Sequence, residues 1–146
     1  MKNYFKKFKI ETKKQFEIAD ITEQIKLAVV ESGVKSGFAI VFSPHTTAGI
    51  RLNHNETLLM QDIMKALYRL VPIDISYSHD LFEVRQNVKP NERSNGNAHV
   101  KAFLLGSSEN VIVEEGLLML GAMQSIFFVE MDGGRNREVY IKVIGE

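Results

Sequence analysis

The sequence of 146 residues contains no cysteine and no tryptophan, and it has no excess of charge of either sign. Without cysteine there can be no disulfide bond and no thiolate chemistry, so packing has to supply the stability. Lysine and arginine together number 18, as do aspartate and glutamate, which leaves a formal net charge of zero. Because a neutral domain has no field that attracts polyanions, no nucleic acid is expected as a partner.

Long hydrophobic runs are also missing. No apolar stretch approaches the roughly 20 residues that cross a bilayer, and the charged beginning of the sequence lacks the apolar core of a signal peptide. We therefore expect no membrane association and a cytoplasmic location. With 45% hydrophobic and 25% charged residues, the composition is typical of a globular protein, and the length fits one domain over residues 1–146.

The spacing of apolar residues predicts an α+β domain with two main helices. Apolar residues recur at helical spacing between residues 21 and 33 and again between residues 58 and 70. Short apolar runs predict strands at residues 4–12, 15–18, 37–42, 50–53, 99–105, 111–113, 116–120, 124–131 and 138–144. This order favours an antiparallel sheet or sandwich, in which residues 15–18 continue the first strand or pair with it.

One polar stretch interrupts this pattern. Glu83 to Asn97 contains Pro90, Gly96 and several asparagines, and it has no apolar periodicity. A loop of this length in a compact domain is usually functional or mobile. It is therefore a candidate for a lid that closes over a bound ligand.

The segment Pro44–Gly49 is the first candidate for chemistry, because it follows a predicted buried strand. It presents the imidazole of His45 and the hydroxyls of Thr46 and Thr47 in one turn. Such a turn, with its exposed backbone N–H groups, can hold an oxyanion, a phosphate or a metal ion. The alternative is a plain turn at a strand end, in which the threonines bond to their own backbone.

The four histidines all fall near predicted loops. Asn97 and His99 are two residues apart, so they share one side of the chain if this segment is a strand. Three neutral imidazoles and a water suit a catalytic zinc ion, which makes His45, His79 and His99 a candidate ligand set. The same histidines could instead donate protons or bind phosphate.

The segment Asp132–Arg137 joins two predicted strands and is therefore expected to form a hairpin turn. Arg135 and Arg137 lie on one side of the chain if it is extended, and two guanidinium groups match the geometry of phosphate oxygens. The alternative is that both arginines are simply solvated. Glu56 could act as a general base or bind magnesium, but it also suits the start of a helix.

Several of these segments occur together in a fixed order: Pro44–Gly49, Glu56, His79, Asn97–His99, Gly106–Ser108, Gly116–Gly121, Gln124 and Asp132–Arg137. In this order and spacing the chain resembles the YjbQ family, whose members are described as secondary thiamine-phosphate synthases. The resemblance implies an α+β fold built on an antiparallel sheet, and a homotrimer with a site near the subunit contacts. Two positions depart from the family pattern, Met123 in place of tryptophan and Gly134 in place of proline.

The resemblance also implies an activity: a pyrimidine-methyl diphosphate joins a thiazole phosphate, and pyrophosphate leaves. The expected catalytic residues are His45, His79, His99 and Glu56. The expected substrate-binding residues are Thr46, Thr47, Asn97, Gln124, Asp132, Arg135 and Arg137. Zinc or magnesium is compatible with the histidines, and no organic cofactor is expected. Two other functions stay open, a non-catalytic protein that binds a phosphorylated metabolite and a metal-dependent hydrolase that uses the histidine cluster.

Overall fold

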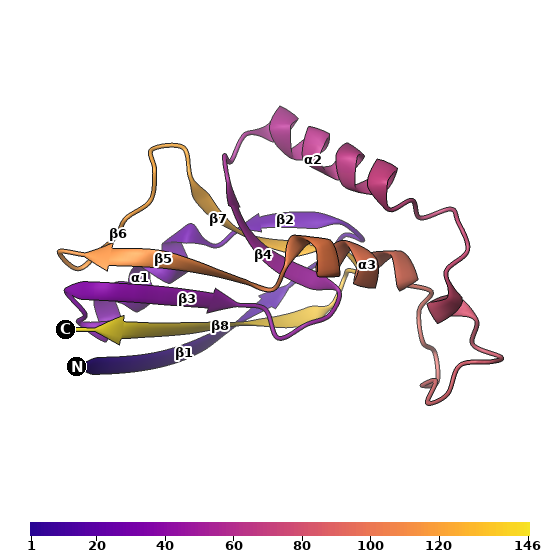
Figure 1. The fold of residues 1–146 in the computed structure, drawn as a ribbon, viewed down its shortest axis with the longest axis horizontal. Helices are drawn as coiled ribbons and strands as arrows, with labels where there is room; N and C mark the ends of the chain where they lie inside the picture. The colour runs from indigo at the N-terminus through magenta and orange to yellow at the C-terminus, as the bar shows by residue number, and fades with distance from the viewer.

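The computed structural model describes residues 1–146 and confirms an α+β fold, with two antiparallel sheets (Figure 1). The first sheet has the strand order β1-β8-β3-β5-β6, and the second has the order β2-β7-β4. The strands are β1 (Lys2–Glu11), β2 (Glu17–Asp20), β3 (Ser36–Phe42), β4 (Ala48–Asn53), β5 (Ser108–Glu114), β6 (Leu117–Leu118), β7 (Ser125–Glu130) and β8 (Asn136–Gly145). The helices are α1 (Thr22–Ser32), α2 (Thr57–Leu70) and α3 (Gly96–Leu105), with a short 3-10 helix η1 (Ser78–Asp80).

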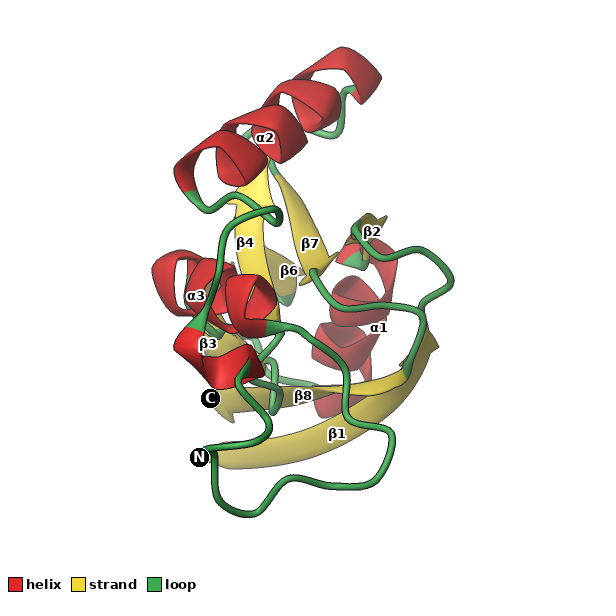
Figure 2. Ribbon diagram, turned by 90° about the vertical axis from the view of Figure 1, so that its right-hand side faces the viewer, coloured by secondary structure: helices red, strands yellow, loops and turns green.

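The main core lies between the two sheets. In Figure 2, β4 and β7 run across the direction of β1 and β8, and α1 lies beside them. Alternate residues of β8, including Val139 and Ile141, are fully buried against this layer. The intervening Tyr140 and Lys142 face the other side and stay partly exposed. The first sheet therefore has one buried face and one that its own chain leaves uncovered.

Helix α1 begins and ends where the sequence predicts. The Asp20 carboxylate accepts a hydrogen bond from the backbone N–H of Thr22 at 2.9 Å, close to the helix start. Gly33 follows the last turn with φ 67°, a left-handed conformation that glycine adopts at low cost. Ile25 and Val29 then lie one turn apart on the buried face.

Helix α3 contradicts the predicted strand over residues 99–105. Asn97, Ala98, Lys101 and Ala102 are buried, and this spacing of one and four residues is helical. The pattern was hidden in the sequence because two of these four inward-facing residues are polar. Helix α3 is thus a third helix, and it covers the face of the second sheet that points away from the main core.

The position of β7 corrects two further predictions. β7 lies between β2 and β4, whereas β8 belongs to the first sheet. β2 therefore pairs with β7 and not with the first strand. For the same reason the segment Asp132–Arg137 is not a hairpin turn, because it carries the chain from one sheet to the other. This connection places polar side chains between the end of β7 and the start of β8.

Helix α2 and the segment after it lie at the periphery (Figure 1). Glu56 caps α2 by accepting a hydrogen bond from the backbone N–H of Leu59, and only Leu67 of the helix is fully buried. Residues 81–95, called the strap below, contain no helix or strand and lead directly into α3. None of the three α-helices has the length and apolar character of a membrane span.

Candidate functional site

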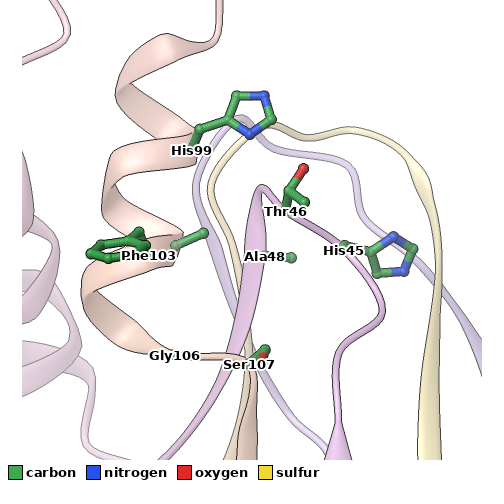
Figure 3. Close-up of a pocket in the computed structure, with 8 residues that line it drawn as sticks. His45, Thr46, Ala48, His99, Phe103, Gly106 and Ser107 are labelled. Atoms are coloured by element: carbon green, nitrogen blue, oxygen red, sulfur yellow. The ribbon is translucent and has the colours of Figure 1, made fainter.

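Three segments that are distant in the sequence meet at one end of the molecule: the β3–β4 loop, α3 and the β7–β8 connection. Together with the strap they line a hollow of about 390 Å³, called the polar hollow, in which every lining residue except Pro44 is polar or charged. Its residues are Pro44, His45, Thr46, Thr47, Asn87, Lys89, Glu92, Asn95, His99, Arg135 and Arg137. A second hollow of about 340 Å³ adjoins it and shares His45, Thr46 and His99. Figure 3 shows Thr46 between the two imidazoles.

His45 is held by the neighbouring strand. Its Nε2 lies 2.9 Å from the backbone N and 3.1 Å from the backbone O of Glu138, at the start of β8. Burial lowers the pKa of His45, and the nearby positive charge of Arg137 lowers it further. The lowered pKa favours the neutral ring, in which Nε2 is engaged by the backbone and Nδ1 makes no hydrogen bond within the protein.

His79 and His99 form a pair on the other side of Thr46. Their ring centroids are 4.6 Å apart, and the rings meet edge to face. Burial lowers the pKa of His99, as does the proximity of His79. The Arg85 guanidinium lies against the His79 ring, 3.0 Å from Nε2. The same guanidinium nitrogen lies 3.3 Å from Nδ1, so the His79 ring is already in contact with a cation.

The three histidines do not form the metal-ligand set that the sequence suggested. Figure 3 shows His45 and His99 on opposite sides of Thr46. His45 is bonded to the backbone of Glu138, whereas the His99 ring meets the His79 ring edge to face. The structure contains no group of three His, Cys, Asp or Glu side chains arranged to hold a metal ion. The arrangement of the three histidines therefore suits hydrogen-bond donation by neutral imidazoles better than tetrahedral coordination of zinc.

Arg137 is part of a buried ion pair. Its guanidinium donates to both oxygens of Glu130, at 2.8 and 2.5 Å, and to the Thr47 hydroxyl at 2.7 Å. Thr12 donates to the same carboxylate at 2.6 Å. Burial raises the pKa of Glu130, but the hydrogen bonds from Arg137 and Thr12 outweigh it, and the net direction is down. Arg137 therefore brings little free charge to a ligand.

Arg135 lies closer to the solvent. Its guanidinium donates to the Asp132 carboxylate at 2.6 Å, and about a third of its side chain is exposed. Asn95 donates to the same carboxylate at 2.8 Å. Burial raises the pKa of Asp132, but these two partners and Arg93 hold it below its ordinary value. Asp132 thus orients Arg135 at the wall of the polar hollow and does not itself face a ligand as a free base.

Other predicted site residues have different positions. Asn97 lies on the buried face of α3, where its amide oxygen accepts a hydrogen bond from the Lys101 ammonium at 2.7 Å. It therefore does not orient His99. Residues two apart on a helix point in different directions, unlike residues two apart on a strand. Glu56 and Gln124 lie beyond the far end of β4, which spans roughly 20 Å. Gln124 accepts from the backbone of Gly121 at 2.8 Å.

Several residues of the polar hollow were missed by sequence reasoning, and they belong to the strap. Asn87, Lys89 and Glu92 line the hollow directly. Arg85 forms an ion pair with Glu92 inside the strap and donates to the backbone oxygen of His79, and Arg93 donates hydrogen bonds to the β7–β8 connection. The sequence predicted a functional loop here, but a polar stretch without periodicity does not reveal which of its side chains turn inward.

The sequence is similar to those of known proteins along almost its whole length. A family described as "UPF0047 protein YjbQ-like" matches residues 6–146. A UPF0047 protein of Methanocaldococcus jannaschii is 40% identical over 141 residues, covering 96% of this chain and 94% of its own length. The UPF0047 protein YugU of Bacillus subtilis is 38% identical over 140 residues, covering 96% and 98%.

Solved structures support the same assignment. A YbjQ-like protein of unknown function from Sulfolobus solfataricus P2 is 36% identical to this chain, with a TM-score of 0.90 and 99% of each chain covered. A yjbq/upf0047 family protein from Clostridium acetobutylicum is 40% identical, with a TM-score of 0.84 over 94% of this chain and 98% of its own. From the match along residues 6–146 and these likenesses of sequence and fold, the chain belongs to the YjbQ-like UPF0047 family.

Proposed function

We propose that the polar hollow binds the phosphate or diphosphate group of a small metabolite, and that the protein is a transferase of the thiamine-phosphate synthase type. The observation that carries this proposal is the composition of the hollow. Every lining residue except Pro44 is polar or charged, and the hollow combines the Arg135 guanidinium with the imidazoles of His45 and His99, whose lowered pKa favours the neutral form. These groups are donors to the oxygens of an anion.

The proposed reaction joins a pyrimidine-methyl diphosphate to a thiazole phosphate. The bond between the methylene carbon and the diphosphate oxygen breaks, its electron pair leaves with pyrophosphate, and the thiazole nitrogen forms the new bond to carbon. The step needs no base, because the attacking nitrogen carries no proton. This fits a site where the nearby carboxylates Glu92, Glu130 and Asp132 are all paired with arginine. The protein's contribution is then to bind and orient both groups and to stabilise the leaving anion.

The second hollow has a complementary character that suits this reaction. It is lined in part by Ala48, Ala102 and Phe103, and it opens onto the same imidazoles as the polar hollow. A ring system can lie there while its phosphate points to Arg135. A protein that only binds a phosphorylated metabolite would use the same two hollows, so turnover has to be measured directly. The histidine-based hydrolase lacks a formed ligand set.

The test is release of pyrophosphate from the two proposed substrates, together with calorimetric binding of pyrophosphate. Arg135→Ala should weaken pyrophosphate binding by roughly 1.5–3 kcal/mol, the range for hydrogen bonds to charged groups. Arg69→Ala, on the exposed side of α2, is the control and should bind as wild type does. Binding without turnover would replace the transferase by a binding protein. A wild-type protein that binds no pyrophosphate would overturn both.

We also propose a homotrimer, in which subunits meet on the uncovered face of the first sheet. Large apolar side chains are exposed there in cross-strand register. Phe38 pairs with Ile112 on β5, and Phe42 pairs with Tyr140 on β8. An exposed apolar cluster of this kind on a sheet is typical of a subunit contact.

A further inference from the structure

The cations around the polar hollow differ in how much of their charge is already neutralised. Arg137 is bound to Glu130 and Arg135 to Asp132, each through a hydrogen-bonded ion pair. Lys89 also lines the hollow, but its ammonium makes no ion pair and no side-chain hydrogen bond. We infer that Lys89 is a further cation, beside Arg135, that receives the anionic group of the ligand. This inference rests on the proposed phosphate-binding function and adds a residue to it.

The strap holds Lys89 in a defined position. Its backbone N–H donates to the Glu92 carboxylate at 2.9 Å, and the backbone N–H of Glu92 donates to the carbonyl of Lys89 at 3.3 Å. These two bonds close a tight turn between the residues. The turn thereby fixes the backbone of Lys89, a residue that lines the hollow, while its side-chain amine makes no hydrogen bond or ion pair.

Arg85 anchors this turn to the rest of the site. Its guanidinium forms an ion pair with Glu92 and donates to the backbone oxygen of His79 at 2.8 Å. The carboxylate of Glu92 is therefore neutralised by Arg85 and does not compete for the Lys89 ammonium. The pairing leaves the positive charge of Lys89 without a counterion inside the protein, which an anionic ligand can supply.

Arg93 fixes the other end of the turn. Its guanidinium donates to the carbonyl oxygens of Asp132, Gly133 and Gly134, at 2.9, 3.2 and 3.1 Å. These carbonyls belong to the connection that also carries Arg135. The strap and the β7–β8 connection are thus tied together, so Lys89 and Arg135 line one hollow from two segments and can bind the same anion.

The experiment measures the dissociation constant of inorganic pyrophosphate by calorimetry at low and at physiological ionic strength. Lys89→Ala should raise it about five- to tenfold at low salt, since an exposed charge-assisted contact is lost. Lys89→Arg should stay within about twofold of wild type, and Lys89→Glu should bind more weakly than Lys89→Ala. The matched control is Lys65→Ala. Lys65 is an exposed lysine on α2 that does not line the hollow.

A second measurement does not depend on a variant. Pyrophosphate should slow reductive methylation of the Lys89 amine, followed by mass spectrometry, and leave the rate at Lys65 unchanged. If wild type binds pyrophosphate, and Lys89→Ala and Lys65→Ala bind it equally well, the role of Lys89 is overturned while the proposed function stands. If wild type binds no pyrophosphate at all, the proposed function fails and this inference with it.

Discussion

At the scale of single residues, the pair of Glu130 and Arg137 has the largest structural consequence. The sequence indicated that Arg137 could bind phosphate. In the structure its partner is instead Glu130, seven positions earlier at the end of an apolar strand. Nothing in a single sequence indicates that this carboxylate points into the protein. Arg137 is 6% exposed and Glu130 is fully buried, so the pair mainly holds β7, β8 and the Thr47 loop together.

Removing the charge of Glu130 should therefore destabilise the protein strongly. Glu130→Gln leaves the buried guanidinium of Arg137 without a counterion, and breaking such a pair costs about 3–5 kcal/mol. Urea unfolding measures the loss, with Glu83→Gln in the exposed strap as the control that should change stability by less than about 0.5 kcal/mol. A Glu130→Gln protein as stable as the control would show that the ion pair contributes little.

At the scale of elements, α3 is the helix that the spacing of apolar residues did not predict. Alternating and helical patterns are hard to distinguish in a short apolar run, and Asn97 and Lys101 interrupt the buried side of this one. The buried Lys101 ammonium lies 4.3 Å from the centre of the Tyr68 ring, a contact between α3 and α2 that only the fold creates. Helices α1 and α2 were predictable because their ends and apolar faces are local features of the sequence.

The start of α3, the helix that carries His99, packs closely against Tyr77. A Cβ atom at Gly96 would lie 2.6 Å from the Cβ of Tyr77, too close for either residue to remain in place. Gly96→Ala should therefore shift the helix and destabilise the protein by about 1–3 kcal/mol, measured by thermal unfolding. Gly121→Ala is the matched control, because its new Cβ meets only the flexible end of Gln124. Equal stability of the two variants would mean that the contact at Gly96 relaxes freely.

At the scale of the whole molecule, the sequence identified the fold class and the segments that meet at the site. It could not pair those segments because, apart from β5 and β6, the residues that pair between strands are 66 to 143 positions apart in the sequence. His45 and Arg135, both expected as site residues from their types and the resemblance, line one hollow in the structure. The neutral state of the imidazoles and the pairing of the carboxylates required the burial and the neighbours that the fold supplies.

The same burial makes the protein sensitive to acid. The pKa of His45 and of His99 is lowered in the folded state, so the unfolded chain binds more protons once the pH falls below its ordinary histidine value of about 6.5. Their contribution to stability is full above that pH and is lost as the pH decreases. Urea midpoints should therefore drop between pH 7.5 and 5.5. His99→Gln should reduce the drop and His54→Gln should not; an unchanged drop in His99→Gln would remove His99 as a cause.

The uncovered face of the first sheet gives the last prediction at this scale. If subunits meet there, a charge placed among the apolar side chains of that face would be desolvated on assembly and would oppose it. Ile112→Lys should therefore turn a particle of three times 16.6 kDa into a monomer, as measured by light scattering after size exclusion. Leu27→Lys is the matched control, because Leu27 is also exposed and apolar but lies on α1, against the opposite face of the sheet. Its mass should equal that of wild type. A trimer that survives Ile112→Lys would place the subunit contact elsewhere, and a monomeric wild type would overturn the proposed homotrimer.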